Sequence, residues 1–98
     1  MARLDVYQLS NGVTVVDVQA GPLDRLATHV VVPLVPQARA PAPIDDLNPV
    51  FEIAGIAHVM QTQAIAGIPK RELRAPVASL DREHDRITRA LDVPLLGY

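Results

Sequence analysis

The chain has one long helical signal, Ser79-Leu80-Asp81-Arg82-Glu83-His84-Asp85-Arg86-Ile87-Thr88-Arg89-Ala90-Leu91-Asp92. Apolar residues at spacings of seven, four and four define one face of this helix: Leu80, Ile87, Leu91 and Leu95. We expect Asp81 to be the N-cap, because its carboxylate can accept from the free amides of the first turn. On the polar face, Asp85 and Arg89 are predicted to form an ion pair.

The end of this segment carries a proline and then an apolar tip. Pro94 lacks an amide proton, so the regular helix should stop or kink near Val93. The chain then ends on Leu95-Leu96-Gly97-Tyr98, which is unfavourable in water unless something covers it. Local features favour docking onto the chain's own core or a second copy. The alternative is contact with a partner protein.

The first third of the chain has the pattern of β-strands. Two β-rich runs, 3–9 and 13–19, flank Ser10-Asn11-Gly12, and Asn-Gly favours a hairpin with a type I′ turn. A loop is expected over 21–25. Residues 28–35 are predicted to form a central strand, with Pro33 at a bulge or at the far end of the strand because it cannot donate to a ladder.

The middle of the chain is rich in proline and then returns to strand character. Residues 36–49 are expected to form a semi-rigid loop. Val50–Ile53 and Ile56–Met60 flank Ala54-Gly55 and predict a second hairpin. Residues 61–73 are ambiguous, since a helical turn there would be broken by the glycine and proline that follow, and 71–77 is a candidate for one more strand. The fold class is therefore mainly β, a small barrel or twisted sheet with one helix laid across it.

Length and composition restrict the function classes. The 98 residues fit one domain, in which Val, Leu, Ile and Ala must build the core because aromatic residues are only 3%. A formal net charge of −2 argues against nucleic acid as the main ligand. Cysteine is absent, and neither a signal peptide nor a membrane-spanning run is recognised, so we expect a cytoplasmic protein that does not enter a membrane.

No constellation of residues predicts catalysis. His84 and Asp85 are adjacent on a helix and point about 100° apart, which favours a solvated histidine over a catalytic dyad. Two further histidines, His29 and His58, lie in predicted strands without a metal-ligand motif. The residues therefore favour a binding protein that is not an enzyme, with no catalytic residue, metal ligand or cofactor assigned.

The order of five segments resembles the CcdB toxins of toxin–antitoxin modules: 15–19, 30–34, 47–53, 60–69 and 79–98. The resemblance covers essentially the whole chain, so residues 1–98 are expected to form a single CcdB-like toxin domain. It implies an SH3-like small barrel of antiparallel strands with a single C-terminal helix, of the kind shared by CcdB and MazF toxins. It also implies a homodimer.

The resemblance further implies that the chain poisons DNA gyrase without catalysing a reaction. CcdB-like toxins bind the GyrA subunit through their last three residues and hold the gyrase–DNA cleavage complex in its broken state; they meet DNA only indirectly. By position, these residues are Leu96, Gly97 and Tyr98, of which only the glycine is shared with the family's tryptophan, glycine and isoleucine.

A CcdA-like antitoxin is the other partner that the resemblance implies. The antitoxin is expected to use the loop over 37–46 and the charged helix face of Arg82, Asp85, Arg86 and Arg89. Two alternatives stay open. The altered tip is compatible with a CcdB-like protein that has lost or changed its target and only binds its antitoxin, and the barrel is compatible with a MazF-like endoribonuclease.

Overall fold

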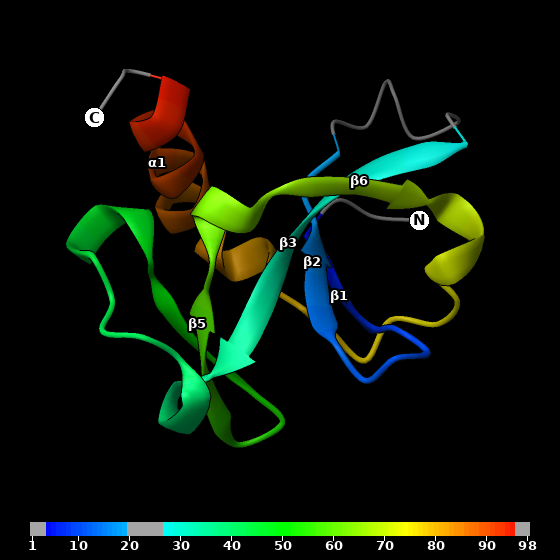
Figure 1. Ribbon diagram of the computed structural model, residues 1–98, viewed down its shortest axis with the longest axis horizontal. Helices are drawn as coiled ribbons and strands as arrows, with labels where there is room; N and C mark the ends of the chain where they lie inside the picture. Colours follow the sequence, from blue (N-terminus) through cyan, green and yellow to red (C-terminus); the bar gives the residue numbers. More distant parts are fainter. Residues whose placement is uncertain (1–3, 20–26, 96–98) are drawn as a thin grey trace.

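A computed structural model describes residues 4–19 and 27–95 (Figure 1). The loop expected over 21–25 and the tip Leu96-Gly97-Tyr98 lie outside these residues. The described chain forms an antiparallel, nearly closed small barrel with one C-terminal helix, which confirms the predicted fold class. In Figure 1 the helix lies at the top and the turns of the two hairpins lie at the bottom.

The strands are short and follow the order β4-β5-β3-β2-β1-β7, with β6 also paired to β3. Their bounds are β1 Asp5–Gln8, β2 Thr14–Asp17, β3 Thr28–Pro36, β4 Val50–Ile53, β5 Ile56–Met60, β6 Ala66–Pro69 and β7 Ala78–Ser79. The helix α1 spans His84–Leu95. Single 3₁₀ turns connect the strands: η2 Gln37–Arg39, η3 Asp45–Leu47, η4 Thr62–Ala64, η5 Lys70–Glu72 and η6 Asp81–Glu83.

The long strand β3 is central, as its valine-rich sequence predicted, but Pro33 lies within it and not at a bulge or at its end. Proline is tolerated there because two different strands share that edge of β3. The β6 ladder ends at Val31, the β5 ladder begins at Leu34, and the Pro33 carbonyl accepts from the Gln61 amide at 2.9 Å. The missing N–H of Pro33 therefore falls between the two ladders and costs neither of them a bond.

Both predicted hairpins form, but the type I′ turn occurs in the second hairpin and not in the first. Gly12 has φ +88° and its amide donates to the Leu9 carbonyl, but Asn11 is not at positive φ. The β1–β2 connection is thus a three-residue loop with glycine at the left-handed position, and the predicted type I′ turn is wrong. Ala54 and Gly55 both have positive φ, +52° and +81°, which makes the β4–β5 turn the type I′ turn.

The start of α1 differs from the prediction. Asp81 opens the turn η6, whose N-cap is Leu80 without a side-chain cap bond, so Asp81 is not the N-cap. The Asp81 amide donates to Ser79 Oγ at 3.3 Å, which gives that amide a local partner before the α-helix begins. At the other end, α1 continues to Leu95, two residues past the predicted stop. Proline already has helical φ, and one lost bond in a last turn is tolerated.

The predicted apolar stripe packs on the sheet. Leu80, Ile87 and Ala90 are buried with the inward side chains of the strands, and Leu91 packs partly against them. The side chain of Leu95 lies outside the described set. A smaller cluster forms on the other side of the sheet, from Tyr7, Val15, Val31 and Leu73. The helix therefore closes the main core.

The ambiguous segment after β5 resolves into turn and strand. Thr62–Ala64 forms the turn η4, and Gly67 and Pro69, predicted to break structure, lie in β6. Both residues pair with the first half of β3, whose Thr28 side chain approaches Gly67 closely. The extra strand expected over 71–77 is instead the two-residue β7, because 70–72 turns in η5 first.

Candidate functional site

The charged helix face is exposed, and one of its arginines, Arg86, also contacts the barrel. Arg86 donates to the Val50 carbonyl at 3.1 Å and to Glu83 Oε1 at 3.2 Å. Its guanidinium carbon lies 4.7 Å from the centre of the Phe51 ring, within cation–π range. Arg86 therefore connects the helix to β4 and is only partly available to a partner.

The other three residues predicted for the antitoxin, Arg82, Asp85 and Arg89, are exposed. The expected ion pair between Asp85 and Arg89 is wrong. Asp85 Oδ1 instead lies 3.5 Å from His84 Nδ1, with both side chains largely in solvent, so this contact contributes little. His84 is solvated, as its position on the helix predicted.

A small hollow of about 90 Å³ joins this helix face to the Pro-rich loop. Arg86 and Arg89 line it from the helix, and Asp46 and Pro49 line it from the loop side. The loop is fixed here because the buried Asn48 donates to the Met60 carbonyl at 2.9 Å and accepts from the Ile44 amide at 3.1 Å. Two surfaces that the sequence suggested separately thus meet at one place.

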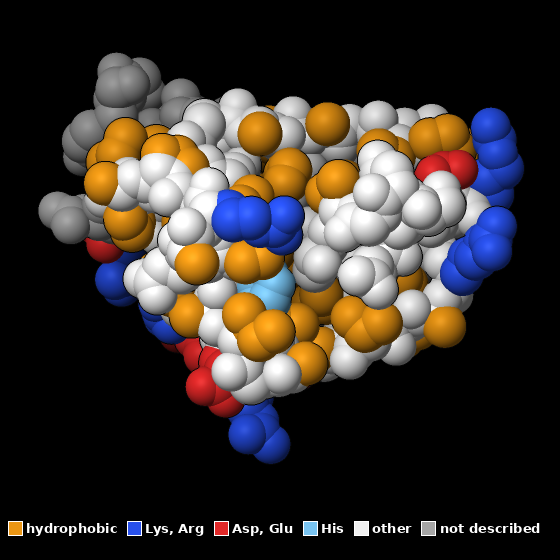
Figure 2. Space-filling view, turned by 60° about the horizontal axis from the view of Figure 1, so that its bottom comes forward, with side chains coloured by type: hydrophobic (Ala, Val, Ile, Leu, Met, Phe, Trp, Pro, Cys, Tyr) orange, Lys and Arg blue, Asp and Glu red, His pale blue; other side chains and the backbone are white. Residues whose placement is uncertain are grey.

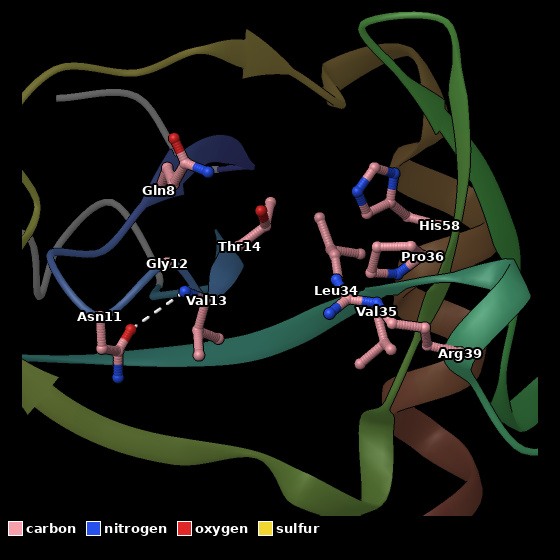
Figure 3. A pocket seen from close by; sticks show the side chains of 10 residues that line it. All are labelled: Gln8, Asn11, Gly12, Val13, Thr14, Leu34, Val35, Pro36, Arg39 and His58. Atoms are coloured by element: carbon pink, nitrogen blue, oxygen red, sulfur yellow. Dashed lines mark hydrogen bonds between the residues drawn. The ribbon is translucent and has the colours of Figure 1, made fainter.

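A larger groove of about 410 Å³ lies at the opposite end of the barrel (Figure 3). The β1–β2 turn forms one wall, the end of β3 forms the floor, and η2 and β5 form the other wall. Figure 2 shows this face with hydrophobic side chains around a histidine, one basic side chain beside it, and the acidic and other basic side chains toward the edges. No Asp or Glu is among the described residues that line the groove.

His58 is the polar centre of this groove, and no sequence motif predicted a role for it. The side chain is only 7% exposed, and its Nδ1 lies 2.8 Å from the Ile56 carbonyl, to which it donates. That hydrogen bond selects the tautomer in which Nε2 of the neutral ring is an acceptor. In Figure 3 the ring points Nε2 toward the open groove, and the guanidinium of Arg39 points in the same direction.

Another histidine, His29, is structural. It is fully buried, and its Nδ1 lies 2.9 Å from Asp17 Oδ2, while Asp17 Oδ1 accepts from the Gln19 amide at 2.9 Å. The Gln19 side chain in turn accepts from the Val30 amide. These bonds satisfy a buried polar cluster between β2 and β3 and leave it without access to a ligand.

Among residues 4–19 and 27–95, no three His, Asp or Glu side chains converge in the way a metal ion needs. Within the same residues no helix has the length and apolar character needed to cross a bilayer.

Comparison with known proteins identifies the family of this chain. The family model described as "CcdB protein" matches residues 3–97, nearly the whole chain. The chain belongs to the CcdB family. Membership of the CcdB family suggests a toxin of a toxin–antitoxin module, in agreement with the expectation from the order of segments. None of the curated proteins matches the chain significantly.

A solved structure shares the barrel of this CcdB-family chain. It is described as an endoribonuclease from mycobacterial species, with a TM-score of 0.80 and 17% sequence identity, over 97% of this chain and 90% of that one. At this identity the similarity establishes the fold alone. The CcdB-family barrel is therefore shared with a protein named for RNA cleavage, and the gyrase target needs its own test.

Proposed function

We propose that this protein is the toxin of a type II toxin–antitoxin module, that it acts as a cytoplasmic homodimer, and that it poisons DNA gyrase. In this proposal Leu96, Gly97 and Tyr98 bind the GyrA subunit and trap the gyrase–DNA cleavage complex. The single observation that supports it most is the CcdB family match over residues 3–97. The protein catalyses no step itself, because it only stabilises an intermediate of the gyrase reaction.

The packing of α1 supports a role for the tip. Ile87 and Ala90 are fully buried against the strands, and Arg86 connects the same helix to β4. A helix anchored on two sides keeps its own last described turn in place, so in this proposal the tip starts from a fixed point, which lowers the entropy cost of binding. Leu96 replaces the family's tryptophan and removes a ring, while Tyr98 restores an aromatic side chain two positions later.

The decisive experiment is a gyrase DNA-cleavage assay with the purified protein. We expect linear DNA to accumulate with the intact chain and not with a chain that ends at Leu95. Leu96→Trp is the matched variant, since it returns the ring and should strengthen trapping if the tip binds as proposed. If the intact chain binds no GyrA fragment and traps no cleaved DNA, the gyrase target is wrong.

In the same proposal a CcdA-like antitoxin binds the exposed helix residues Arg82, Asp85 and Arg89, together with the loop over 37–46. Arg86 was predicted to join them, but its contacts with Val50, Glu83 and Phe51 favour a mainly structural part for it. The hollow between Arg89 and Asp46 supports one continuous surface for this partner. If this chain has instead lost or changed its target and only binds its antitoxin, the same antitoxin surface would remain, and expression of the chain alone would leave growth unaffected.

RNA cleavage is the second candidate, and one observation favours it: Nε2 of His58 faces a groove, where an imidazole can take or give a proton. The mycobacterial endoribonuclease has the same fold. The test is a metal-free digest of RNA. Cleavage by the intact chain, abolished in His58→Asn, would establish this function in place of gyrase poisoning.

A further inference from the structure

We propose that the groove between the β1–β2 turn and β5 is a binding site for a nucleotide. The phosphate lies between Arg39 and His58, and the base lies against the apolar wall formed by Val13 and Val35. The site goes beyond gyrase poisoning and does not depend on it, because none of the residues that line the groove belongs to the C-terminal tip. It also requires no cleavage of the ligand.

The strongest observation is the buried histidine. More than nine-tenths of His58 is buried, yet only Nδ1 is engaged by a described protein group, the Ile56 carbonyl. Nε2 points into the groove (Figure 3). Nε2 is open to the groove, because no side-chain nitrogen or oxygen of the described residues is both buried and unpaired, so a ligand can bond to it without displacing a protein group. The imidazole donates to a phosphate oxygen when protonated.

The charge of the groove selects an anion. The guanidinium of Arg39 lines the groove and makes no ion pair or hydrogen bond with the described residues. None of the described lining residues is acidic, so nothing on these walls competes for the arginine. One guanidinium group can donate two parallel hydrogen bonds to two oxygens of the same phosphate. This geometry favours a phosphate over a ligand with a single neutral acceptor.

The rest of the groove suits a base. Val13, on the β1–β2 turn, is 40% exposed, and Val35 is half-buried on β3, so both offer apolar surface. The amides of Gln8 and Asn11 lie along the same wall and can donate to and accept from base edges. Asn11 Oδ1 already accepts from the Val13 amide at 3.0 Å, which orients its NH₂ group as a free donor. The groove volume of about 410 Å³ is within the range of small-molecule sites.

The test is an NMR and calorimetric titration of the intact protein with inorganic phosphate, uridine monophosphate, adenosine monophosphate and a six-residue single-stranded RNA. We expect both nucleotides to bind, phosphate to bind more weakly at the same place, and the shifts to centre on His58 and the β1–β2 turn. Comparison of the mononucleotides with the RNA distinguishes a free nucleotide from one within a strand. Tighter binding of the RNA than of the mononucleotides would mean that the site binds a nucleotide within an RNA strand.

Two variants and one matched control make the result specific. Arg39→Gln should weaken nucleotide binding about tenfold or more, because a charge-assisted bond is lost. His58→Asn keeps a donor for the Ile56 carbonyl and removes the nitrogen in the groove, so it should weaken binding several-fold. Arg71→Gln removes one positive charge from an exposed residue outside the groove and should leave binding unchanged.

Three outcomes would overturn the proposal. One is the absence of nucleotide binding at millimolar concentration, and another is equal weakening by Arg39→Gln and Arg71→Gln, which would indicate non-specific charge. The third is binding of an acidic peptide at this groove with no binding of nucleotides. If His58→Asn fails to fold, the Arg39 comparison alone decides. Trapping of gyrase by Arg39→Gln should be normal, so failure here is separate from failure of the gyrase proposal.

Discussion

The helix end and the groove end of this barrel each present an arginine, and the two arginines have different partners. At the helix end, Arg86 contacts Val50, Glu83 and Phe51. At the groove end, Arg39 has no partner among the described residues and faces a hollow. Arg86 therefore stabilises the fold, whereas the polar groups at the groove end remain available to a ligand. Both residues are exposed arginines, so only their contact partners distinguish the two roles.

The core beneath the helix should be the most sensitive part of the molecule to mutation. Ile87→Ala should lower the free energy of unfolding by about 2–5 kcal/mol, because Ile87 is fully buried in the main cluster and truncation leaves a cavity. Urea denaturation measures the change. Asp85→Ala, at an exposed position on the same helix, is the control and should stay within about 0.5 kcal/mol. A small effect of Ile87→Ala would mean that the helix contributes little to stability.

The next largest effect should come from Arg86. Arg86→Met retains most of the side chain's length but loses the bonds to Val50 and Glu83 and the contact with Phe51, so unfolding should require about 1–2 kcal/mol less. Arg89→Met is the matched control on the same helix face. Equal losses in the two variants, again by urea denaturation, would contradict the assignment of Arg86 as the structural arginine.

A stabilising change is expected in the hairpin that carries His58. Ala54 has φ +52°, a conformation that is unfavourable for any residue with a β-carbon. Ala54→Gly should therefore raise the free energy of unfolding by about 0.5–1 kcal/mol, net of the extra chain entropy of glycine. Thermal unfolding measures the gain, and a lower melting temperature would mean that the turn tolerates alanine without strain.

Arg39 should contribute little to stability, unlike Arg86. Arg39→Gln should change stability by less than about 0.5 kcal/mol, because the guanidinium has no described partner to lose. The same variant should weaken nucleotide binding. A change at Arg39 would then affect binding without affecting stability, whereas a change at Arg86 would affect stability. A large loss of stability in Arg39→Gln would place this arginine among the structural residues.

Much of the fold could be predicted because burial repeats at the period of each element. Leu80, Ile87 and Leu91 marked the inner face of the helix, and the run of valines in β3 marked a strand buried on both faces. Turn type was less predictable. The dipeptide Asn11-Gly12 permits a type I′ turn, but the pairing of Leu9 with Val13 leaves three residues between the strands, and the length of the loop decided its form.

The groove could not be predicted, for a different reason. Arg39 and His58 lie far apart in the sequence, and neither belongs to a motif. They meet because the end of β3 pairs with β5, which sets Pro36 opposite His58, and because η2 turns the chain back at once. The role of His58 also depends on which ring nitrogen is already hydrogen-bonded to the protein. The bond to the Ile56 carbonyl decides this, and it cannot be predicted from the residue type.

Pro33 has a consequence for how reliably the sheet aligns. A strand that slips by two residues keeps its apolar side chains on the correct face, so burial alone does not exclude that error. On the shared edge of β3, however, a slipped β5 or β6 would place one of its carbonyls opposite a position without an N–H. The proline therefore acts as a spacer that keeps the two neighbours apart. It penalises misaligned sheets that hydrophobic patterning would accept.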